Sequence, residues 1–204
     1  AAAEGGDGAD GDTGGGSGGG GGAAGFGGTA GDDFPLIDVD PDVVEEATID
    51  EQTAEFGETK TVSRITFDET TLGSVTVSEF GGLSDSTVET ITERIAGDAT
   101  GIDSASEIDL VTVVDISPGS LASDQAAATV EIEVPTEQLD DPENAVIVHR
   151  TAGGWTIQET TVQDVSGGTV TLTAPVDSFS LFAVVEQSPS QVTTPTSTPA
   201  QVTA

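Results

Sequence analysis

His149 is the only side chain of this sequence whose ordinary pKa lies near neutrality. A serine hydrolase would place it beside a serine nucleophile and an aspartate, but the sequence shows no nucleophile elbow, the strand–turn–helix serine motif. A zinc site would need further histidines or cysteines, and the chain has no Cys. We therefore interpret His149 as a surface or strand-end residue beside Arg150.

Trp155 is the only tryptophan, and its ring could stack on a sugar. Because it follows two glycines and precedes an alternating strand, we interpret it instead as a core residue of a β-sandwich. The many carboxylates include no recognisable catalytic pair, since such a pair depends on a pocket that separates the two pKa values. We predict that the protein is not an enzyme and holds no cofactor.

Three aspartates, Asp38, Asp40 and Asp42, occupy alternate positions. On a strand they would project from one face and could share a cation. Residues 7–12 resemble only the start of a calcium-binding loop, because the later ligands are missing. We interpret the row as solvated acidic surface, with a weak cation site as the alternative.

The charge balance is extreme, with 37 Asp and Glu against 4 Lys and Arg and a formal net charge of -33. Such a chain repels itself in dilute buffer, whereas at molar salt the Debye length falls to roughly 3 Å. This composition is typical of a protein from a very salty medium. Nucleic acid is excluded as a partner, because phosphates are neutralised by basic residues.

The two ends of the chain differ from its middle. Residues 1–31 hold 16 of the 27 glycines, the composition of a flexible linker. Residues 188–204 are rich in Pro, Thr and Ser, as in an extended stalk. No apolar run approaches the length of a membrane span. We predict one folded domain, residues 32–187, between two disordered linkers.

The middle of the chain must supply the elements that position these side chains. Residues 153–186 predict three strands, with Gly167-Gly168 as a two-residue turn that needs positive φ. Pro175 is expected to end the second strand, because it has no backbone N–H. The almost wholly apolar run 179–185 predicts a central strand that is buried on both faces.

Earlier segments alternate in the same way. Strands are predicted at residues 34–39, 59–67, 73–77, 107–116, 128–134 and 145–148. The second and third of these are joined by a turn at residues 68–70. One helix is predicted near residues 84–96, with Ser86 and Glu89 as a capping box and Gly97 as its end. We interpret this helix as a cover over one end of a sandwich, with partner binding as the alternative.

Together these elements predict an all-β fold. It is a single immunoglobulin-like β-sandwich of about seven to nine strands with one short helix, at about residues 86–96, flanked by disordered linkers. Its expected core anchors are Trp155, Phe179 and Phe182.

Three segments carry a resemblance to a known family. Residues 128–139 are similar to a family strand that ends in Val-Pro and a Leu. Residues 146–155, followed by Thr160 and Thr161, are similar to a strand, a small turn, a Trp and a Thr. Residues 179–184, Phe-Ser-Leu-Phe-Ala-Val, resemble the closing motif Phe-Ser-x-Phe-Ala-Ile, although Asp-Ser precedes them here and Pro-Gly or Gly in the family. From about residue 59 to 186 the chain therefore resembles the PGF-pre-PGF domain of archaeal, including haloarchaeal, cell-surface proteins.

The resemblance implies a location and a role. In that family the domain precedes a Thr-rich stalk, a Pro-Gly-Phe motif, an apolar segment and basic residues, which an archaeosortase processes and replaces with a lipid anchor. We therefore expect a non-catalytic, extracellular structural or interaction module, a membrane-proximal spacer of the cell surface. Its expected partners are other envelope proteins, or itself, and it meets the membrane only through an anchor beyond this chain.

An alternative function follows from the apolar segment near the glycine tract. Its apolar residues, Phe34, Leu36, Ile37 and Val39, could be donated as a strand to a neighbouring molecule, which would make a pilus-like filament subunit. The other interpretation is that this segment completes its own sandwich. A third, weaker function is binding of a sugar or a cation.

The composition generates a first prediction. Lowering salt from molar to about 0.1 M should unfold the domain, because the repulsion among its carboxylates is no longer screened. Circular dichroism, recorded as the salt concentration is lowered stepwise, measures the loss of folded structure. A signal that stays constant over the whole range would contradict the assignment to a salt-rich medium.

Overall fold

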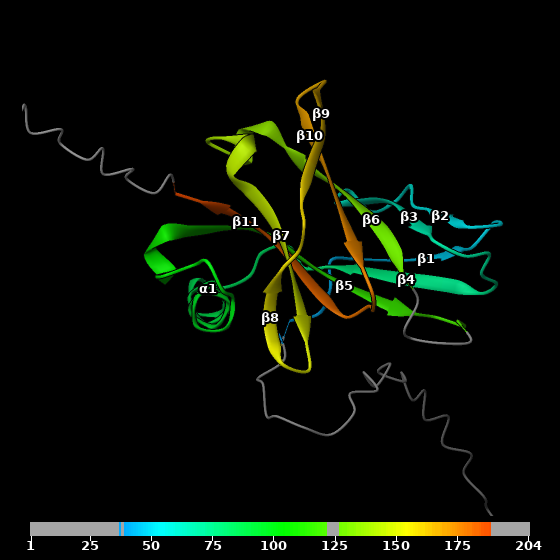
Figure 1. The fold of residues 1–204 in the computed structure, drawn as a ribbon, viewed down its shortest axis with the longest axis horizontal. Coiled ribbons are helices and arrows are strands. Elements are labelled where there is room, and N and C mark those ends of the chain that lie inside the picture. The colour runs from blue at the N-terminus through cyan, green and yellow to red at the C-terminus, as the bar shows by residue number, and fades with distance from the viewer. Residues whose placement is uncertain (1–36, 38, 122–126, 189–204) are drawn as a thin grey trace, which may run out of the picture. The chain divides into compact units, whose positions relative to one another are not determined.

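The computed structural model describes Ile37, residues 39–121 and residues 127–188 (Figure 1). The predicted linker 1–31 and all of the predicted stalk except Ser188 lie outside the described residues. The first seven strands are β1 (Val43–Thr48), β2 (Thr53–Glu55), β3 (Val62–Phe67), β4 (Ser74–Glu79), β5 (Ile108–Pro118), β6 (Ala128–Pro135) and β7 (Ala145–Thr151). The last four are β8 (Gly154–Ile157), β9 (Thr161–Ser166), β10 (Thr169–Val176) and β11 (Leu181–Gln187). The helices are α1 (Asp85–Asp98) and the 3-10 turns η1 (Ala105–Glu107), η2 (Thr136–Gln138) and η3 (Pro142–Asn144).

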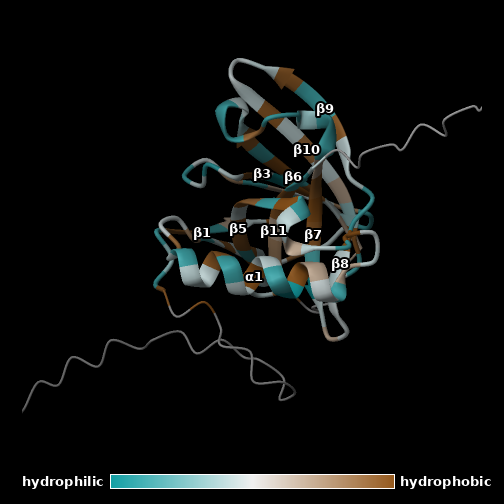
Figure 2. Cartoon of the chain, turned by 90° about the vertical axis from the view of Figure 1, so that its left-hand side faces the viewer, coloured by the Kyte–Doolittle hydropathy of each residue, from teal (hydrophilic) through white to brown (hydrophobic). Residues whose placement is uncertain are grey.

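These strands form two antiparallel sheets that pack face to face. The six-stranded sheet has the order β1-β4-β5-β11-β7-β8 and the five-stranded sheet the order β2-β3-β6-β10-β9. Figure 2 shows three layers, with α1 on the outer face of the six-stranded sheet and the five-stranded sheet on its other face. The predicted all-β sandwich is confirmed, although the described residues contain more strands than expected.

The first strands differ most from the prediction. No strand includes Ile37 or Val39, and the rest of the predicted strand 34–39 lies outside the described residues. The chain instead begins its first sheet with β1, whose sequence Val-Val-Glu-Glu-Ala-Thr does not alternate. The reason is that Glu45 projects from the core side of β1, between Val43 and Ala47, where an apolar residue is expected.

Two connections cross between the sheets where the sequence suggested local continuity. The turn after β3 does not make a hairpin, because β3 pairs with β2 and β6 whereas β4 pairs with β1 and β5. Similarly, residues 153–186 contain four strands and not the three predicted, because Trp155 on β8 and Val162 on β9 belong to separate strands in different sheets. Both residues are apolar, and apolarity alone does not reveal which sheet they face.

The β9–β10 hairpin follows the predicted turn chemistry. Its connection is Gly167-Gly168, with φ of 62° and 87°, a region in which glycine has no Cβ penalty. Ser166 pairs with Thr169 across it. The strand does not end at Pro175, however, because β10 continues to Val176. Pro175 lies beyond the last residue paired with β9 and aligns only with Thr129 of β6, so β10 has an edge there.

The last strand of the chain lies in the middle of its sheet. β11 pairs with β5 on one side and with β7 on the other, and five of its seven residues are buried. This confirms the prediction of a central strand buried on both faces. Because β11 is the last strand in the sequence and joins β5 to β7, the six-stranded sheet cannot form without the C-terminal part of the domain.

The main core fills the space between the two sheets. It contains alternating residues of both, such as Val130 and Ile132 from β6, which are fully buried. Phe67 and Phe179 meet within it in an edge-to-face arrangement, with ring centroids 5.8 Å apart.

A second apolar cluster lies between α1 and the outer face of the six-stranded sheet. The helix contributes Ile91 and Ile95, while Trp155 of β8 is the largest side chain from the sheet. The helix begins at Ser84, whose Oγ accepts from the N–H of Thr87, so the predicted capping box at Ser86 is wrong. Gly97, which was predicted to end the helix, lies inside it. The helix thus covers a face of the sandwich and not an end.

Two glutamates of the six-stranded sheet hold a loop of the other sheet. Glu45 of β1 accepts hydrogen bonds from the backbone N–H groups of Gly57, Glu58 and Thr59, at 2.8–3.2 Å. Glu79 of β4 accepts from the next two N–H groups, of Lys60 and Thr61, at 2.8 and 2.5 Å. Five consecutive amides of the β2–β3 connection are therefore bound by two carboxylates, which we call the β2–β3 clamp.

A third glutamate does the same for another connection. Glu186 of β11, 8 % exposed, accepts from the N–H groups of Asp140 and Asp141, at 2.8 and 2.6 Å. These two residues lie on the path from β6 in one sheet to β7 in the other. Buried carboxylates are costly unless they are hydrogen-bonded, and here backbone amides meet that need without any basic residue.

The clamp generates a stability prediction. Replacement of Glu79, which is 8 % exposed, by alanine leaves two amides without acceptors and should lower the free energy of unfolding by about 3 kcal/mol. Urea unfolding at molar salt measures this change. The matched control is Glu137→Ala at an exposed position, which should change stability by less than about 0.5 kcal/mol. Equal effects of the two substitutions would show that the clamp does not stabilise the fold.

Candidate functional site

The outer face of the five-stranded sheet is a candidate surface for interaction. No helix of the described residues packs on it, and its side chains are mainly threonines and acids, together with Arg64, Ser63 and Gln163. The registers and burial place these residues on it: Thr53, Glu55, Arg64, Thr66, Thr129, Glu131, Glu133, Thr161, Thr171 and Thr173. The alternation of β6 predicted this face, because Thr129, Glu131 and Glu133 point away from the core.

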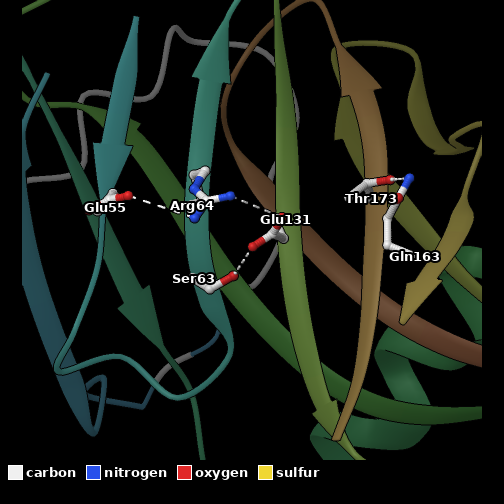
Figure 3. Close-up of polar contacts among 6 residues, drawn as sticks. All are labelled: Glu55, Ser63, Arg64, Glu131, Gln163 and Thr173. Carbon is white, nitrogen blue, oxygen red and sulfur yellow. Dashed lines mark hydrogen bonds and ion pairs between the residues drawn. The ribbon is translucent and has the colours of Figure 1, made fainter. Parts of the chain in front are cut away.

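Arg64 lies between Glu55 and Glu131 in one of the two groups of polar contacts on this face, and Gln163 donates to Thr173 in the other (Figure 3). The guanidinium of Arg64 is 3.7 Å from carboxylate oxygens of Glu55 on β2 and Glu131 on β6, so it bridges three neighbouring strands. Ser63 donates a second contact to Glu131, at 2.8 Å. The Arg64 side chain is 47 % exposed, and ion pairs in water of this kind contribute little to stability.

An open depression lies at the margin of this face. Its volume is about 620 Å³, and it is lined by Thr48, Asp50, Glu51, Thr53, Glu55, Arg64 and Thr66. The lining is polar and acidic, without an aromatic ring. Glu51, at the turn into β2, has φ of 58°, which is unusual for a residue with a side chain. Within the described part of the chain, no three potential ligands are grouped closely enough to hold a metal ion.

Trp155 lies under α1 and is 2 % exposed. Its indole is therefore not a surface platform on which a sugar can stack. The carboxylate of Asp98, the last residue of α1, accepts a hydrogen bond from the backbone N–H of Trp155 at 3.3 Å. Phe182 and Phe179, the other two expected core anchors, are 0 % and 8 % exposed, and both belong to the main core between the sheets.

His149 is buried, contrary to the expectation of a surface or strand-end residue. It is 3 % exposed and its ring stacks on Phe182, with centroids 4.2 Å apart and planes 7° from parallel. Ser180 Oγ donates its one proton to the carbonyl oxygen of Arg150, so in the 3.0 Å contact His149 Nε2–H is the donor and Ser180 Oγ the acceptor. This direction is opposite to that of a histidine that activates a serine nucleophile.

The predicted cation row is only partly described. Asp38 lies outside the described residues, while Asp40 and Asp42 are both exposed on the approach to β1. The segment proposed as a donor strand is also described in part, because Phe34 and Leu36 lie outside. Ile37 packs against the cluster beneath α1, and Val39 is 37 % exposed.

The three glutamates that bind backbone amides were not singled out from the sequence. Glu45, Glu79 and Glu186 each occur at or next to an apolar run of a strand, where a charge breaks the alternation. That interruption is the signal that could have found them. Partial burial raises the pKa of Glu45, but the hydrogen bonds from the backbone of Gly57, Thr59 and Glu58 together lower it below the ordinary value of 4.5.

Comparisons with known proteins identify no relative: no family model, no curated protein and no solved structure matches this chain. No helix of the described residues has the length and apolarity needed to cross a membrane.

Burial of His149 generates a prediction for the pH dependence of stability. Burial lowers the pKa of His149 from 6.5 to about 4, because the charged imidazolium is desolvated in the core. The unfolded chain therefore binds a proton at higher pH than the folded protein does. Stability is full above pH 6.5 and falls as the pH is lowered toward about 4, by roughly 3 kcal/mol in total.

Urea unfolding at molar salt tests this dependence. Between about pH 7.5 and about pH 5 the free energy of unfolding should fall by roughly 2 kcal/mol in the unmodified protein. His149→Leu should remove most of this fall, even though the substitution changes stability at neutral pH. An equal fall in both proteins would assign the effect to the carboxylates.

Proposed function

We propose that this chain is a non-catalytic structural module of an archaeal cell-surface protein from a salt-rich environment. The sandwich acts as an extracellular spacer close to the membrane, and the Pro/Thr-rich segment after it forms the stalk. Other envelope proteins are the proposed partners.

The observation that carries this proposal is the way in which the fold supplies hydrogen-bond donors to its acidic side chains. Thirty-seven acidic residues accompany four basic ones, and buried or half-buried glutamates bind backbone amides in place of lysine or arginine. A fold held together in this way does not depend on basic residues, so its surface can remain strongly acidic. At high salt such a surface stays soluble because its self-repulsion is screened while its charge remains.

The broad exposed sheet face agrees with a spacer. Its threonines and glutamates present hydroxyl and carboxylate groups to water, and the depression at its margin is open and polar. The three segments that resemble the PGF-pre-PGF domain form β6, the β7–β8 pair and β11. They therefore include the central strand of one sheet and a strand beside the centre of the other, the parts of a domain on which its packing depends.

The test is mass spectrometry of the native protein isolated from the cell envelope. The proposal expects a C-terminal peptide that continues beyond Ala204 to a lipid-modified end, because the stalk would join the module to the membrane. A protein recovered only from the medium, with no lipid on any C-terminal peptide, would contradict membrane tethering.

Light scattering at molar salt separates the spacer from a self-assembling filament. A spacer of 20.3 kDa should keep the mass of one chain as its concentration is raised. A filament subunit should polymerise instead, and removal of residues 1–40 should stop that growth. Polymerisation of the purified chain would replace the spacer with the filament.

A further inference from the structure

The four edge strands of the two sheets differ in how they are protected. β2 is only three residues long. On β8, the backbone N–H of Trp155 donates to the carboxylate of Asp98, so the end of α1 covers that edge. β1 carries two glutamates, and Glu45 binds the β2–β3 connection to it. Short length, covering and charge are means by which proteins keep sheet edges from pairing with other chains.

β9 has less protection than the other three edges. It has six residues, and its only neighbour in the five-stranded sheet is β10. Within the described ranges, the hydrogen bonds found outside the sheets include none from or to a backbone group of β9. Figure 1 shows the tip of the β9–β10 hairpin projecting beyond the neighbouring strands. The backbone along the outer side of β9 is therefore open to another strand.

The β9–β10 hairpin carries little charge. Residues 160–176 contain one charged residue, Asp164, whereas charged residues make up 20% of the whole chain. Two copies of a chain with a formal net charge of -33 repel each other least where the segments that meet are nearly neutral. An approach along β9 therefore brings few carboxylates together.

Val162 and Val165 lie on the same side of β9, although they are three positions apart. Val165 lies opposite Val170 and Val162 opposite Leu172, both fully buried, and directly opposite residues share a face of the sheet. A shift of register between the two pairs accommodates one extra residue of β9. Val162 packs against the main core, but Val165 is 54 % exposed. The open edge thus includes an apolar side chain in contact with water.

The backbone groups of the same two valines are directed toward the open edge. Ser166 and Thr169 flank the two-residue turn and form the hydrogen-bonded pair that closes it. Hydrogen-bonded and non-hydrogen-bonded pairs alternate along an antiparallel ladder, so the N–H and C=O of Val165 point away from β10. Beyond the extra residue the same alternation applies to Val162. A strand that pairs with β9 must therefore do so at these two positions.

We propose that the open edge of β9 pairs with β9 of a second copy of the chain, antiparallel and about a two-fold axis, when the chains are concentrated on one surface. The register that matches the outward backbone groups places Val162 opposite Val165 of the second copy, and Val165 opposite Val162 of that copy. Gln163 then lies opposite Asp164 of the second copy. The one charged residue of each hairpin therefore meets an amide and not another acid, and the exposed valine is covered.

Such a pair is closed and weak. Two-fold contacts use the same strand of both chains, so a pair leaves no free β9 and does not grow into a filament. One short strand from each chain makes a small contact, and contacts below roughly 1,200 Å² are typical of transient pairs. Dilute chains therefore stay single, whereas chains held on one membrane meet at a high effective concentration. In this respect the inference rests on the proposed function, because tethering supplies that concentration.

Disulfide cross-linking tests the pairing and its register, because the chain has no Cys. Thr161 and Ser166 are exposed, and the register places them opposite each other across the axis as a non-hydrogen-bonded pair, with Cα atoms about 4.5 Å apart. That separation permits a disulfide, whereas two copies of the same residue are roughly 14 Å apart. Each variant by itself is therefore the matched control for the mixture of both.

Full-length Thr161→Cys and Ser166→Cys chains, each with a C-terminal histidine tag, are held on phosphatidylcholine vesicles that contain a nickel-chelating lipid. The reaction is run at molar salt with a mild oxidant. The mixture should form covalent dimers about tenfold faster than either variant alone, because only the mixture brings two thiols within bonding distance. In dilute solution without vesicles the mixture should react as slowly as the separate variants.

Val165 supplies a second test. In the cross-linking chains, Val165→Asp places an acid opposite Val162 of the second copy and should reduce the rate of the mixture to that of the separate variants. The matched control, Val165→Ile, keeps an apolar β-branched side chain and should keep the rate. Because Val165 is exposed, both proteins should remain folded, which circular dichroism at molar salt verifies.

Each other result overturns the proposal. Equal rates for the mixture and for the separate variants on vesicles would show random collision, and faster cross-linking of one variant with itself would show another register. A rate that survives Val165→Asp would remove the valine pair from the contact, and an equally fast reaction in dilute solution would show a stable dimer. Absence of any cross-link would leave the edge of β9 to a strand of a different protein.

Failure of this pairing is distinguishable from failure of the proposed function. The vesicle supplies the tether in the cross-linking experiment, so its result does not depend on how the native chain is anchored. Conversely, a native protein without a lipid-modified end would contradict membrane tethering and would leave the cross-linking result unchanged.

Discussion

The binding of backbone amides by buried and half-buried carboxylates is the interaction on which the rest of this structure depends. A sandwich of two sheets must hold its connecting loops, and the loop 57–61 and the connection through Asp140 and Asp141 are held by Glu45, Glu79 and Glu186. In most proteins a buried glutamate is paired with a basic side chain. A chain with four basic residues cannot do this widely, and neutral N–H dipoles replace the missing cations.

The six-stranded sheet is the centre of the molecule because both of its faces are covered. The five-stranded sheet packs on one face and α1 on the other, so β11 and its neighbours contribute side chains to two separate clusters. The five-stranded sheet is buried on one face only, which leaves its threonines and glutamates in water. This asymmetry divides the sandwich into a solvated outer face on the five-stranded sheet and a covered outer face beneath the helix on the six-stranded sheet.

Sequence patterns predicted best where one residue type has one physical consequence. Gly167-Gly168 marked a turn because both residues need positive φ, and the alternation of residues 128–134 marked a strand with one wet face. The prediction was wrong where a polar residue faces inward. Glu45 interrupts the apolar alternation of β1, so that strand was not predicted. His149 was predicted at the surface because its burial depends on stacking against Phe182, which lies 33 positions away along the chain.

The sequence alone determined the class of fold, the strongly acidic and cation-poor surface, and the buried character of the last strand, because these follow from local alternation and composition. Only the tertiary structure decided which sheet each strand joins, that Trp155 lies beneath the helix and not between the sheets, and which glutamates bind amides. Those features depend on long-range pairing: an apolar residue fits either face of a sheet, and a carboxylate becomes a clamp only when a distant loop brings its N–H groups to it.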